Sequence, residues 1–407
     1  MESIRVIYYL AILGLPLVAG LGWWWWADRR LRGLPYNWGW RLLMGVFVVV
    51  FSVCYLWLLG TRWMGVAWTP HSWILAYMML WGLIFLPFVA LPSMGLWTIW
   101  RGGGWLMRRV RRWVRKADVP EVVESAMLPS DRMTRRQMMT TAAVTLPMLA
   151  TLGTTAVSIP QKRRFQITEY TLRFDDLPAA LDGMTIAHLS DTHVGKFTRG
   201  RILDRIADAT NDLAADLVLI TGDVIDNTLH DLPEALRMID RIDPRSGLFV
   251  CEGNHDLFDG RENFREAVRE HGTPLLVDEA QTVRVHGERV QLMGIAWHGR
   301  GKPIAPHVDR AVARRDHDAF PILLAHHPDA FDRATEHRIP LTLAGHTHGG
   351  QLMLNDGFGA GPLMFKYWTG LYEKDRSKLI VSNGAGNWFP LRTNAPAEIV
   401  HITLKKA

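Results

Sequence analysis

The chain has 407 residues and a formal net charge of +6, but its two parts differ in composition. Before Phe165 there are 19 basic and 6 acidic residues and 15 of the 18 tryptophans, whereas the remainder holds 27 basic and 34 acidic residues and 15 of the 16 histidines. Because the basic residues lie outside the acidic part, the composition argues against nucleic acid as a partner.

Three apolar runs in the N-terminal part, residues 4–26, 42–60 and 73–100, are long enough to cross a membrane as helices. Tryptophans crowd the ends of these runs, where an indole prefers the membrane interface. Pro87 and Pro92 favour a kink or an early end of the third run. We therefore expect residues 1–104 to form a transmembrane region in the lipid bilayer.

The arginines predict how these helices are oriented. The loop after the first run carries four arginines, the loop after the second carries only Arg62, and the segment from Arg101 to Lys116 carries seven basic residues. Because basic loops stay in the cytoplasm, we expect residues 105–133 to be a cytoplasmic linker. Its first part, residues 105–117, has the pattern of an amphipathic helix on the inner leaflet, with a solvated linker as the alternative.

Residues 134–164 resemble an export signal placed inside the chain. Arg135 and Arg136 precede an uncharged, weakly apolar run, which is typical of the twin-arginine route, although Met138 stands where that route prefers Phe. We expect residues 142–159 to form an uncleaved fourth helix that carries the rest of the chain out of the cytoplasm. The protein would then be a multi-pass inner-membrane protein with a periplasmic C-terminal domain; a cytoplasmic linker or interfacial helix is the alternative.

Five apolar runs between residues 165 and 407 each end in a polar motif, and stretches with a helical pattern lie between them. Near-continuous apolar strands that alternate with helices indicate an α/β domain whose sheet is buried on both faces. Ligands of such sheets gather beyond the carboxyl ends of the strands. The polar residues at these ends are Asp191 and His193, Asp223, Asn254 and His255 with Asp256, His326 and His327, and His346 and His348.

Carboxylate, amide and imidazole groups without thiolates suit borderline divalent metals. The strand ends offer more ligands than one ion needs in a catalytic site with open positions. Two ions about 3.5–4 Å apart can clamp a phosphoryl group and activate a water for attack. We therefore expect two divalent ions, with Mn²⁺ as the first choice and Fe²⁺, Zn²⁺, Ni²⁺ or Mg²⁺ as alternatives.

The ordered motifs D-x-H, G-D-x-x-D, G-N-H-D, a histidine after a strand, and G-H-x-H resemble the calcineurin-like metallophosphoesterase superfamily over about residues 182–404. The fuller forms "LLAHHPD", "LAGHTHGGQ" and "APAEIVHITL" are similar to the bacterial membrane-associated branch with phosphodiesterases of the YkuE and YaeI type. That branch is related to enzymes that cleave the pyrophosphate of UDP-diacylglucosamine. The resemblance implies a four-layer α/β/β/α sandwich for residues 165–407.

Taken position by position, the resemblance implies seven metal ligands. Three residues would hold one ion, three others would hold the second, and one carboxylate would bridge the two. The family pattern H-x-P selects His326 rather than His327. In that order, the implied ligands are Asp191, His193 and His348, then Asn254, His326 and His346, with Asp223 as the bridge.

The resemblance also implies two catalytic residues. His255 would protonate the leaving oxygen or steady the charge on the phosphoryl group, and Asp226 would orient His255. In the segment "GIAWHGRGK", His298 and Arg300 are candidates for contacts with the non-reacting part of a substrate, with an ordinary loop as the alternative. In "NGAGNWFPLR", Arg392 would either bind phosphate or pair locally.

The sequence thus predicts a membrane-anchored, dinuclear-metal phosphoesterase that hydrolyses phosphodiester or pyrophosphate bonds of an envelope or lipid-linked substrate. One alternative is a phosphodiesterase or phosphoprotein phosphatase that faces the cytoplasm, and a reporter fused after Ala407 distinguishes the two sides. The other is a non-catalytic membrane scaffold, which the complete set of motif residues disfavours.

Overall fold

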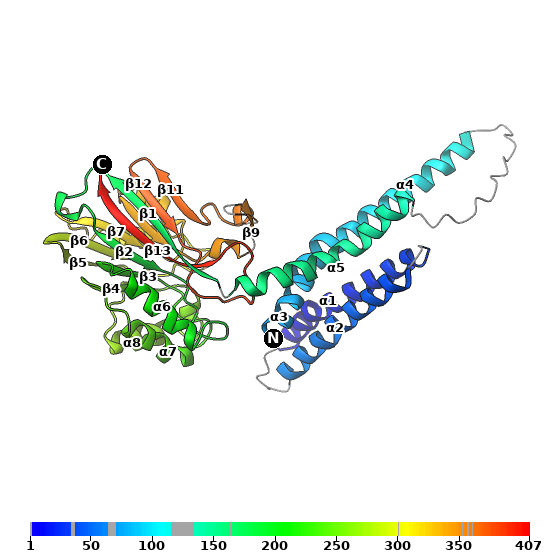
Figure 1. Ribbon diagram of the computed structural model, residues 1–407, viewed down its shortest axis with the longest axis horizontal. Helices are drawn as coiled ribbons and strands as arrows, with labels where there is room; N and C mark the ends of the chain where they lie inside the picture. The colour runs from blue at the N-terminus through cyan, green and yellow to red at the C-terminus, as the bar shows by residue number, and fades with distance from the viewer. Residues whose placement is uncertain are drawn as a thin grey trace. The chain divides into compact units, whose positions relative to one another are not determined.

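The computed structural model describes residues 2–33, 37–63, 71–114, 134–162, 164–299, 301–351, 353–355, 358–359 and 361–407 (Figure 1). The chain forms two compact units, Met1–Val157 and Ser158–Ala407. The second unit begins slightly before residue 165, where the sequence predicts the start of the metal-binding domain. Helix α5 begins in the first unit and ends in the second.

The regular secondary structure in the described part of the first unit is all helical. Pro87 lies inside a π-helical segment, and the helix continues from this segment past Pro92 as far as Val114. The expected early end of the third run is therefore wrong, because wider turns accommodate the missing proline N–H. The helices are α1 (Glu2–Leu31), α2 (Asn37–Trp63), α3 (Ser72–Met79), the π-helical segment (Leu80–Ala90), α4 (Leu91–Val114) and α5 (Arg135–Gln161).

Three helices of the described part are long and apolar enough to cross a membrane: Asn37–Gly60, Ser72–Arg111 and Gln137–Gln161. They correspond to the second and third predicted runs and to the signal-like segment. Helix α1 covers the first predicted run, but the side chains of residues 2–13 lie outside the described part, so its crossing stays a prediction. The basic stretch after residue 104 begins as the last turns of α4, and residues 115–133 lie outside the described residues.

Aromatic side chains pack the helical unit. The ring of Trp81 lies 4.9 Å from that of Trp23 and 4.8 Å from that of Phe47, in edge-on contacts. The guanidinium of Arg30 lies 3.8 Å from the ring centre of Trp97. These contacts join α1, α2, the π-helical segment and α4, and aromatic pairs of this geometry add to the stabilisation from burial.

The second unit contains two mixed sheets (Figure 1). The first has the order β1-β13-β2-β3-β4, and β2, β3 and β4 are parallel. Its strands are β1 (Phe165–Phe174), β13 (Ala397–Lys406), β2 (Thr185–Leu189), β3 (Leu217–Thr221) and β4 (Leu248–Cys251). The second has the order β11-β12-β8-β7-β6-β5, with antiparallel edge strands. Its strands are β11 (Gly370–Lys374), β12 (Ser377–Val381), β8 (Leu341–Ala344), β7 (Phe320–Leu324), β6 (Glu288–Gly294) and β5 (Glu279–Val285).

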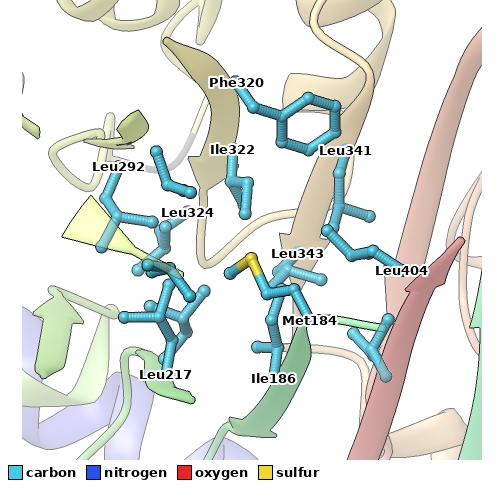
Figure 2. Packing of buried hydrophobic residues seen from close by; sticks show 14 of the residues in the cluster. Met184, Ile186, Leu217, Leu292, Phe320, Ile322, Leu324, Leu341, Leu343 and Leu404 are labelled. Atoms are coloured by element: carbon cyan, nitrogen blue, oxygen red, sulfur yellow. The ribbon is translucent and has the colours of Figure 1, made fainter. Parts of the chain in front are cut away.

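The two sheets pack face to face over an apolar core, in which Ile186 and Leu217 of the first sheet meet Leu292 and Ile322 of the second (Figure 2). Helices cover the outer face of each sheet, and apolar clusters fill both interfaces. The first sheet is covered by α6 (Arg201–Asp212), α7 (Leu232–Asp240) and α8 (Arg261–His271), and the second by α9 (Ala305–Val312) and α10 (Ala330–Glu336). This four-layer arrangement confirms the predicted α/β/β/α sandwich.

The five predicted strands that end in polar motifs are β2, β3, β4, β7 and β8. Strands β3 and β7 are buried at every position, because each is apolar on both faces and lies inside a sheet covered by a helical layer. Parallel neighbours end at the same edge of their sheet. The edges of the two sheets meet where Nδ1 of His326, after β7, donates to the carbonyl oxygen of Thr221 in β3 at 2.8 Å.

Candidate metal centre

Three donor groups meet beyond the ends of β2 and β8. The Nε2 atoms of His193 and His348 lie 2.9 Å apart, and Nε2 of His348 lies 3.1 Å from Oδ1 of Asp191. Nε2 of His193 is 3.6 Å from the same oxygen. All three side chains are buried. Their donor atoms converge on one small volume, as the ligands of one metal ion do.

A second group forms beyond β3, β4, β7 and β8. Nε2 of His326 lies 3.1 Å from Oδ2 of Asp223 and 3.2 Å from Oδ1 of Asn254. The same nitrogen is 3.1 Å from Nδ1 of His346. Two strands of each sheet therefore bring a carboxylate, an amide and two imidazoles together.

The carboxylate of Asp223 lies between the two groups. Its Oδ2 is 3.1 Å from Nε2 of His326 and 3.6 Å from Nε2 of His193. Its Oδ1 accepts a hydrogen bond from the backbone N–H of His255 at 2.8 Å, which fixes the orientation of the carboxylate. One oxygen thus faces both groups, which is the arrangement that a bridging ligand requires.

Backbone strain accompanies this convergence. Five of the seven residues have left-handed φ angles, a conformation that costs a residue with a side chain free energy and clusters at functional sites. These residues are Asp191 (51°), His193 (41°), Asp223 (50°), His346 (69°) and His348 (52°). Glycines allow the close approach of the strand ends, because a Cβ on Gly253 would collide with the carboxylate of Asp223.

The charges of the site fit divalent cations. Burial by itself would lower the pKa of His193, but hydrogen bonding to Asp191 and Asp226 raises it to about 9. The pKa of His326 is likewise raised to about 9 against burial, chiefly by Asp223. The buried carboxylates therefore favour positive charge at this site. A divalent ion supplies such charge, so this donor set fits a metal centre.

The family model of calcineurin-like phosphoesterases matches residues 184–350, and this stretch contains all seven residues of the two groups. The chain carries a calcineurin-like phosphoesterase domain. The family uses divalent metals, in agreement with the donor groups described above.

Similar proteins include an uncharacterized metallophosphoesterase of Helicobacter pylori, which is 31% identical over 250 residues, or 59% of this chain and 64% of that protein. The uncharacterized metallophosphoesterase YkuE of Bacillus subtilis is 28% identical over 59% of this chain and 85% of its own length. A transmembrane protein with metallophosphoesterase domain from Danio rerio is 30% identical over 65% of this chain and 62% of its own length. The chain thus spans less than two thirds of the Helicobacter and Danio proteins. The suspected likeness to YkuE is confirmed.

In the phosphoesterase domain, His255 lies beside the first group of donors. Its Nδ1 donates to the backbone carbonyl oxygen of Asp226 at 2.5 Å, and its ring lies 4.6 Å from that of His193, edge-on. The carboxylate Oδ1 of Asp226 is 3.5 Å from Nδ1 of both His255 and His193. The side chain of His255 is 16% exposed, whereas that of His193 is fully buried, so His255 is the histidine of this pair that a substrate can reach.

Of the predicted substrate contacts in the segment "GIAWHGRGK", the structure describes His298. The ring of His298 is half-buried, 4.7 Å from Trp297 and 5.6 Å from His327, and burial together with His327 lowers its pKa to about 4. Trp297 in turn lies 5.2 Å from the ring of His346, so His298 stands next to the second donor group. Arg300 lies outside the described residues.

The guanidinium of Arg392 is surrounded by hydrogen-bond acceptors of the protein itself. Its side chain is fully buried, its Nε donates to Oδ1 of Asn387 at 2.7 Å, and its Nη1 donates to the carbonyl oxygen of Ala395 at 2.9 Å. Its Nη2 donates to the carbonyl oxygen of Gly386 at 2.6 Å and lies 3.2 Å from Nδ1 of His348. The structure therefore shows local pairing, the alternative that the sequence left open, and the phosphate contact stays a prediction.

Replacing Arg392 by glutamine should destabilise the phosphoesterase domain, because several buried carbonyl oxygens lose their donors. At about 1–3 kcal/mol for an unsatisfied group, we expect the midpoint of thermal unfolding to fall by roughly 5–10 °C. Arg376→Gln is the matched control, because the side chain of Arg376 is 80% exposed. An unchanged unfolding midpoint with lost phosphoesterase activity would instead favour a phosphate contact.

Three aromatic residues near the donor groups were missed by the sequence predictions. The ring of Phe258 lies 4.6 Å from that of His255, Trp388 lies 6.0 Å from the same ring, and Phe365 lies 5.9 Å from His346. Phe258 follows the G-N-H-D motif by two residues, which is the signal that could have found it. Phe365 has no such neighbour in the sequence, because it is brought to the site by the fold.

Proposed function

We propose that the phosphoesterase domain is a dinuclear-metal enzyme that hydrolyses phosphodiester or pyrophosphate bonds. The observation that carries this proposal is the position of the Asp223 carboxylate, whose Oδ2 faces the donor groups of His193 and His326 at 3.6 and 3.1 Å. Two adjacent groups that share one carboxylate suit two ions that act on one phosphoryl group.

Each residue has a role in this proposal. Divalent ions, with Mn²⁺ as our first choice, would stabilise charge on the phosphoryl oxygens and lower the pKa of the attacking water. Asp223 would hold both ions in place. The other ligands are Asp191, His193 and His348 for one ion, and Asn254, His326 and His346 for the other.

In this proposal His255 donates the proton to the leaving oxygen. Because its Nδ1 is engaged by the carbonyl oxygen of Asp226, Nε2 is the nitrogen that can give a proton to the leaving oxygen. The carboxylate of Asp226 also faces the ring of His193, 3.5 Å from its Nδ1, and would stabilise positive charge on that ring. One aspartate thus lies beside both a predicted ligand and the proton donor.

The three candidate spans support a membrane protein, and the Danio relative is named as a transmembrane protein. We infer that the substrate is an envelope or lipid-linked phosphoester and that α5 carries the domain to the periplasmic side of the inner membrane. The paired arginines before α5 and the weak hydropathy of its span support export by the twin-arginine route. A cytoplasmic position remains the alternative that the reporter after Ala407 tests.

Metal removal tests the proposed activity. We expect the purified full chain in detergent to hydrolyse bis(p-nitrophenyl) phosphate, to lose this activity after dialysis against a chelator, and to regain it with Mn²⁺. The chelator acts because ions supply the charge stabilisation at the phosphoryl group. Hydrolysis that is indifferent to the chelator, or a metal-loaded protein that cleaves neither phosphodiesters nor pyrophosphates, would contradict the proposal.

A further inference from the structure

Exposed apolar side chains gather around the metal centre. In the described part of the second unit, five large apolar side chains are exposed, and four of them, Phe258, Leu363, Met364 and Trp388, are defined here as the apolar rim. Leu363 is 89% exposed and Met364 is 74% exposed. A soluble surface rarely concentrates such residues at one place unless something covers them.

The apolar rim borders the centre on two sides. Phe258 and Trp388 both contact the ring of His255, at 4.6 and 6.0 Å. On the other side, Leu363 and Met364 directly precede Phe365, whose ring lies 5.9 Å from that of His346. Apolar side chains of the rim thus lie beside His255 on one side and next to Phe365, the neighbour of His346, on the other.

The end of α5 is attached to the same surface. The hydroxyl groups of Ser158 and Thr393 are 2.5 Å apart, and the backbone N–H of Asn394 donates to Oε1 of Gln161 at 2.6 Å. Gln161 is also the last residue of the candidate span Gln137–Gln161. These bonds join the point where the chain would leave the bilayer to the loop that follows Trp388.

We call the end of α5 at Gln161 and Lys162 the exit point. Further hydrogen bonds connect the exit point to both sides of the apolar rim. Asn387, which precedes Trp388, donates from Nδ2 to the carbonyl oxygen of Lys162 at 3.4 Å. The backbone N–H of Thr393 donates to the carbonyl oxygen of Gln351, and the N–H of Met353 donates to the carbonyl oxygen of Thr393, at 2.8 Å each. Met353 is the first residue of β9 (Met353–Asn355), which precedes Leu363 in the chain.

Basic side chains lie at the exit point as well. The ammonium groups of Lys162 and Lys196 lie 5.2 and 5.3 Å from the ring centre of Phe197. Lysines beside aromatic rings suit the level of anionic lipid headgroups, where the apolar ring and the charge are both stabilised. The charge at this surface is thus complementary to a membrane.

We propose that the apolar rim inserts into the surface of the bilayer that α5 crosses, so that the metal centre opens at the depth of the lipid headgroups. A phosphoester carried by a membrane lipid then reaches the donor groups without leaving the bilayer. The docking itself requires only the rim and the attached end of α5, whereas the lipid phosphoester as substrate rests on the proposed function.

Environment-sensitive labels test the docking. The full chain, with Cys54 and Cys251 replaced by alanine, is labelled with NBD at Leu363→Cys or Phe258→Cys and reconstituted in vesicles of phosphatidylethanolamine and phosphatidylglycerol. We expect blue-shifted emission that doxyl-labelled lipids quench. Gln281→Cys, at an exposed position of β5, is the control and should be quenched by aqueous iodide alone. Rim labels that respond like the control, or that are shielded from iodide without quenching by lipid, would overturn the proposal.

Charged substitutions in the apolar rim test whether docking to the bilayer speeds the hydrolysis of a lipid substrate. The variant L363D/M364D should hydrolyse a phosphoester lipid in vesicles at least about tenfold more slowly, because the burial of one such side chain exceeds the energy of a tenfold change. Its hydrolysis of a soluble aryl diester in detergent should be unchanged, and Leu371→Asp, at an exposed leucine outside the rim, should retain both activities. Equal loss on both substrates would overturn docking. Absence of both activities in the unmutated chain would contradict the proposed function, while the labels would still decide the docking.

Discussion

Replacing Asp223 by asparagine should lower kcat by about three orders of magnitude and should remove bound metal. Asparagine keeps the shape of the side chain but loses the charge that both donor groups share, with Oδ2 of Asp223 at 3.1 Å from His326 and 3.6 Å from His193. Several kcal/mol of charge stabilisation depend on the ions, and each 1.36 kcal/mol is a factor of ten in rate. Steady-state kinetics and elemental analysis of metal per chain measure the two effects.

Asp375→Asn is the matched control for this variant. Asp375 is exposed in the turn between β11 and β12 and has a φ of 54°, a conformation that asparagine tolerates. The control should therefore keep the kcat and the metal content of the unmutated chain. An Asp223→Asn protein with full metal content and nearly full activity would contradict the bridging role of Asp223.

The second large effect is expected for His255→Gln, and its size should depend on the leaving group. General acid catalysis contributes about 10²–10⁴-fold, so hydrolysis of an alkyl diester should fall by a factor in this range. A nitrophenolate leaves without a proton, so hydrolysis of bis(p-nitrophenyl) phosphate should fall far less. Metal content should stay unchanged, because His255 is not among the seven predicted ligands and its backbone N–H, which holds the carboxylate of Asp223, is kept in the variant.

His230→Gln provides the control, because His230 is exposed and precedes α7. It should leave the rates on both substrates unchanged. If His255→Gln slowed both leaving groups equally with full metal content, His255 would steady the charge on the phosphoryl group and would not donate the proton.

The strand-end motifs could be predicted because their physical signal is local. Each of β2, β3, β4, β7 and β8 is a short apolar run that stops at a polar residue, and parallel strands place their ends at one edge. The structure accordingly brings all seven predicted ligands together. The left-handed φ angles of Asp191 and His346 could not be predicted, since they follow from how two sheets meet.

Other features depend on contacts between distant segments. Arg392 was compatible with a phosphate contact in sequence, and only the folding of residues 383–395 around its guanidinium shows that carbonyl oxygens surround it. Pro87 and Pro92 predicted a kink or an early end, yet the helix continues because π-helical turns accommodate a proline. The exposure of Leu363 and Met364 likewise could not be predicted, because an apolar pair in sequence is more often buried.

The most direct test of a dinuclear centre is electron paramagnetic resonance of the full chain after removal of metal and titration with Mn²⁺. Two Mn²⁺ ions held by residues on both sides of the Asp223 carboxylate would lie close enough together to be spin-coupled. We predict a coupled dinuclear signal that reaches its maximum at two ions per chain, together with phosphodiesterase activity. An uncoupled six-line signal at saturation, with one ion per chain or with two isolated ions, would contradict the account.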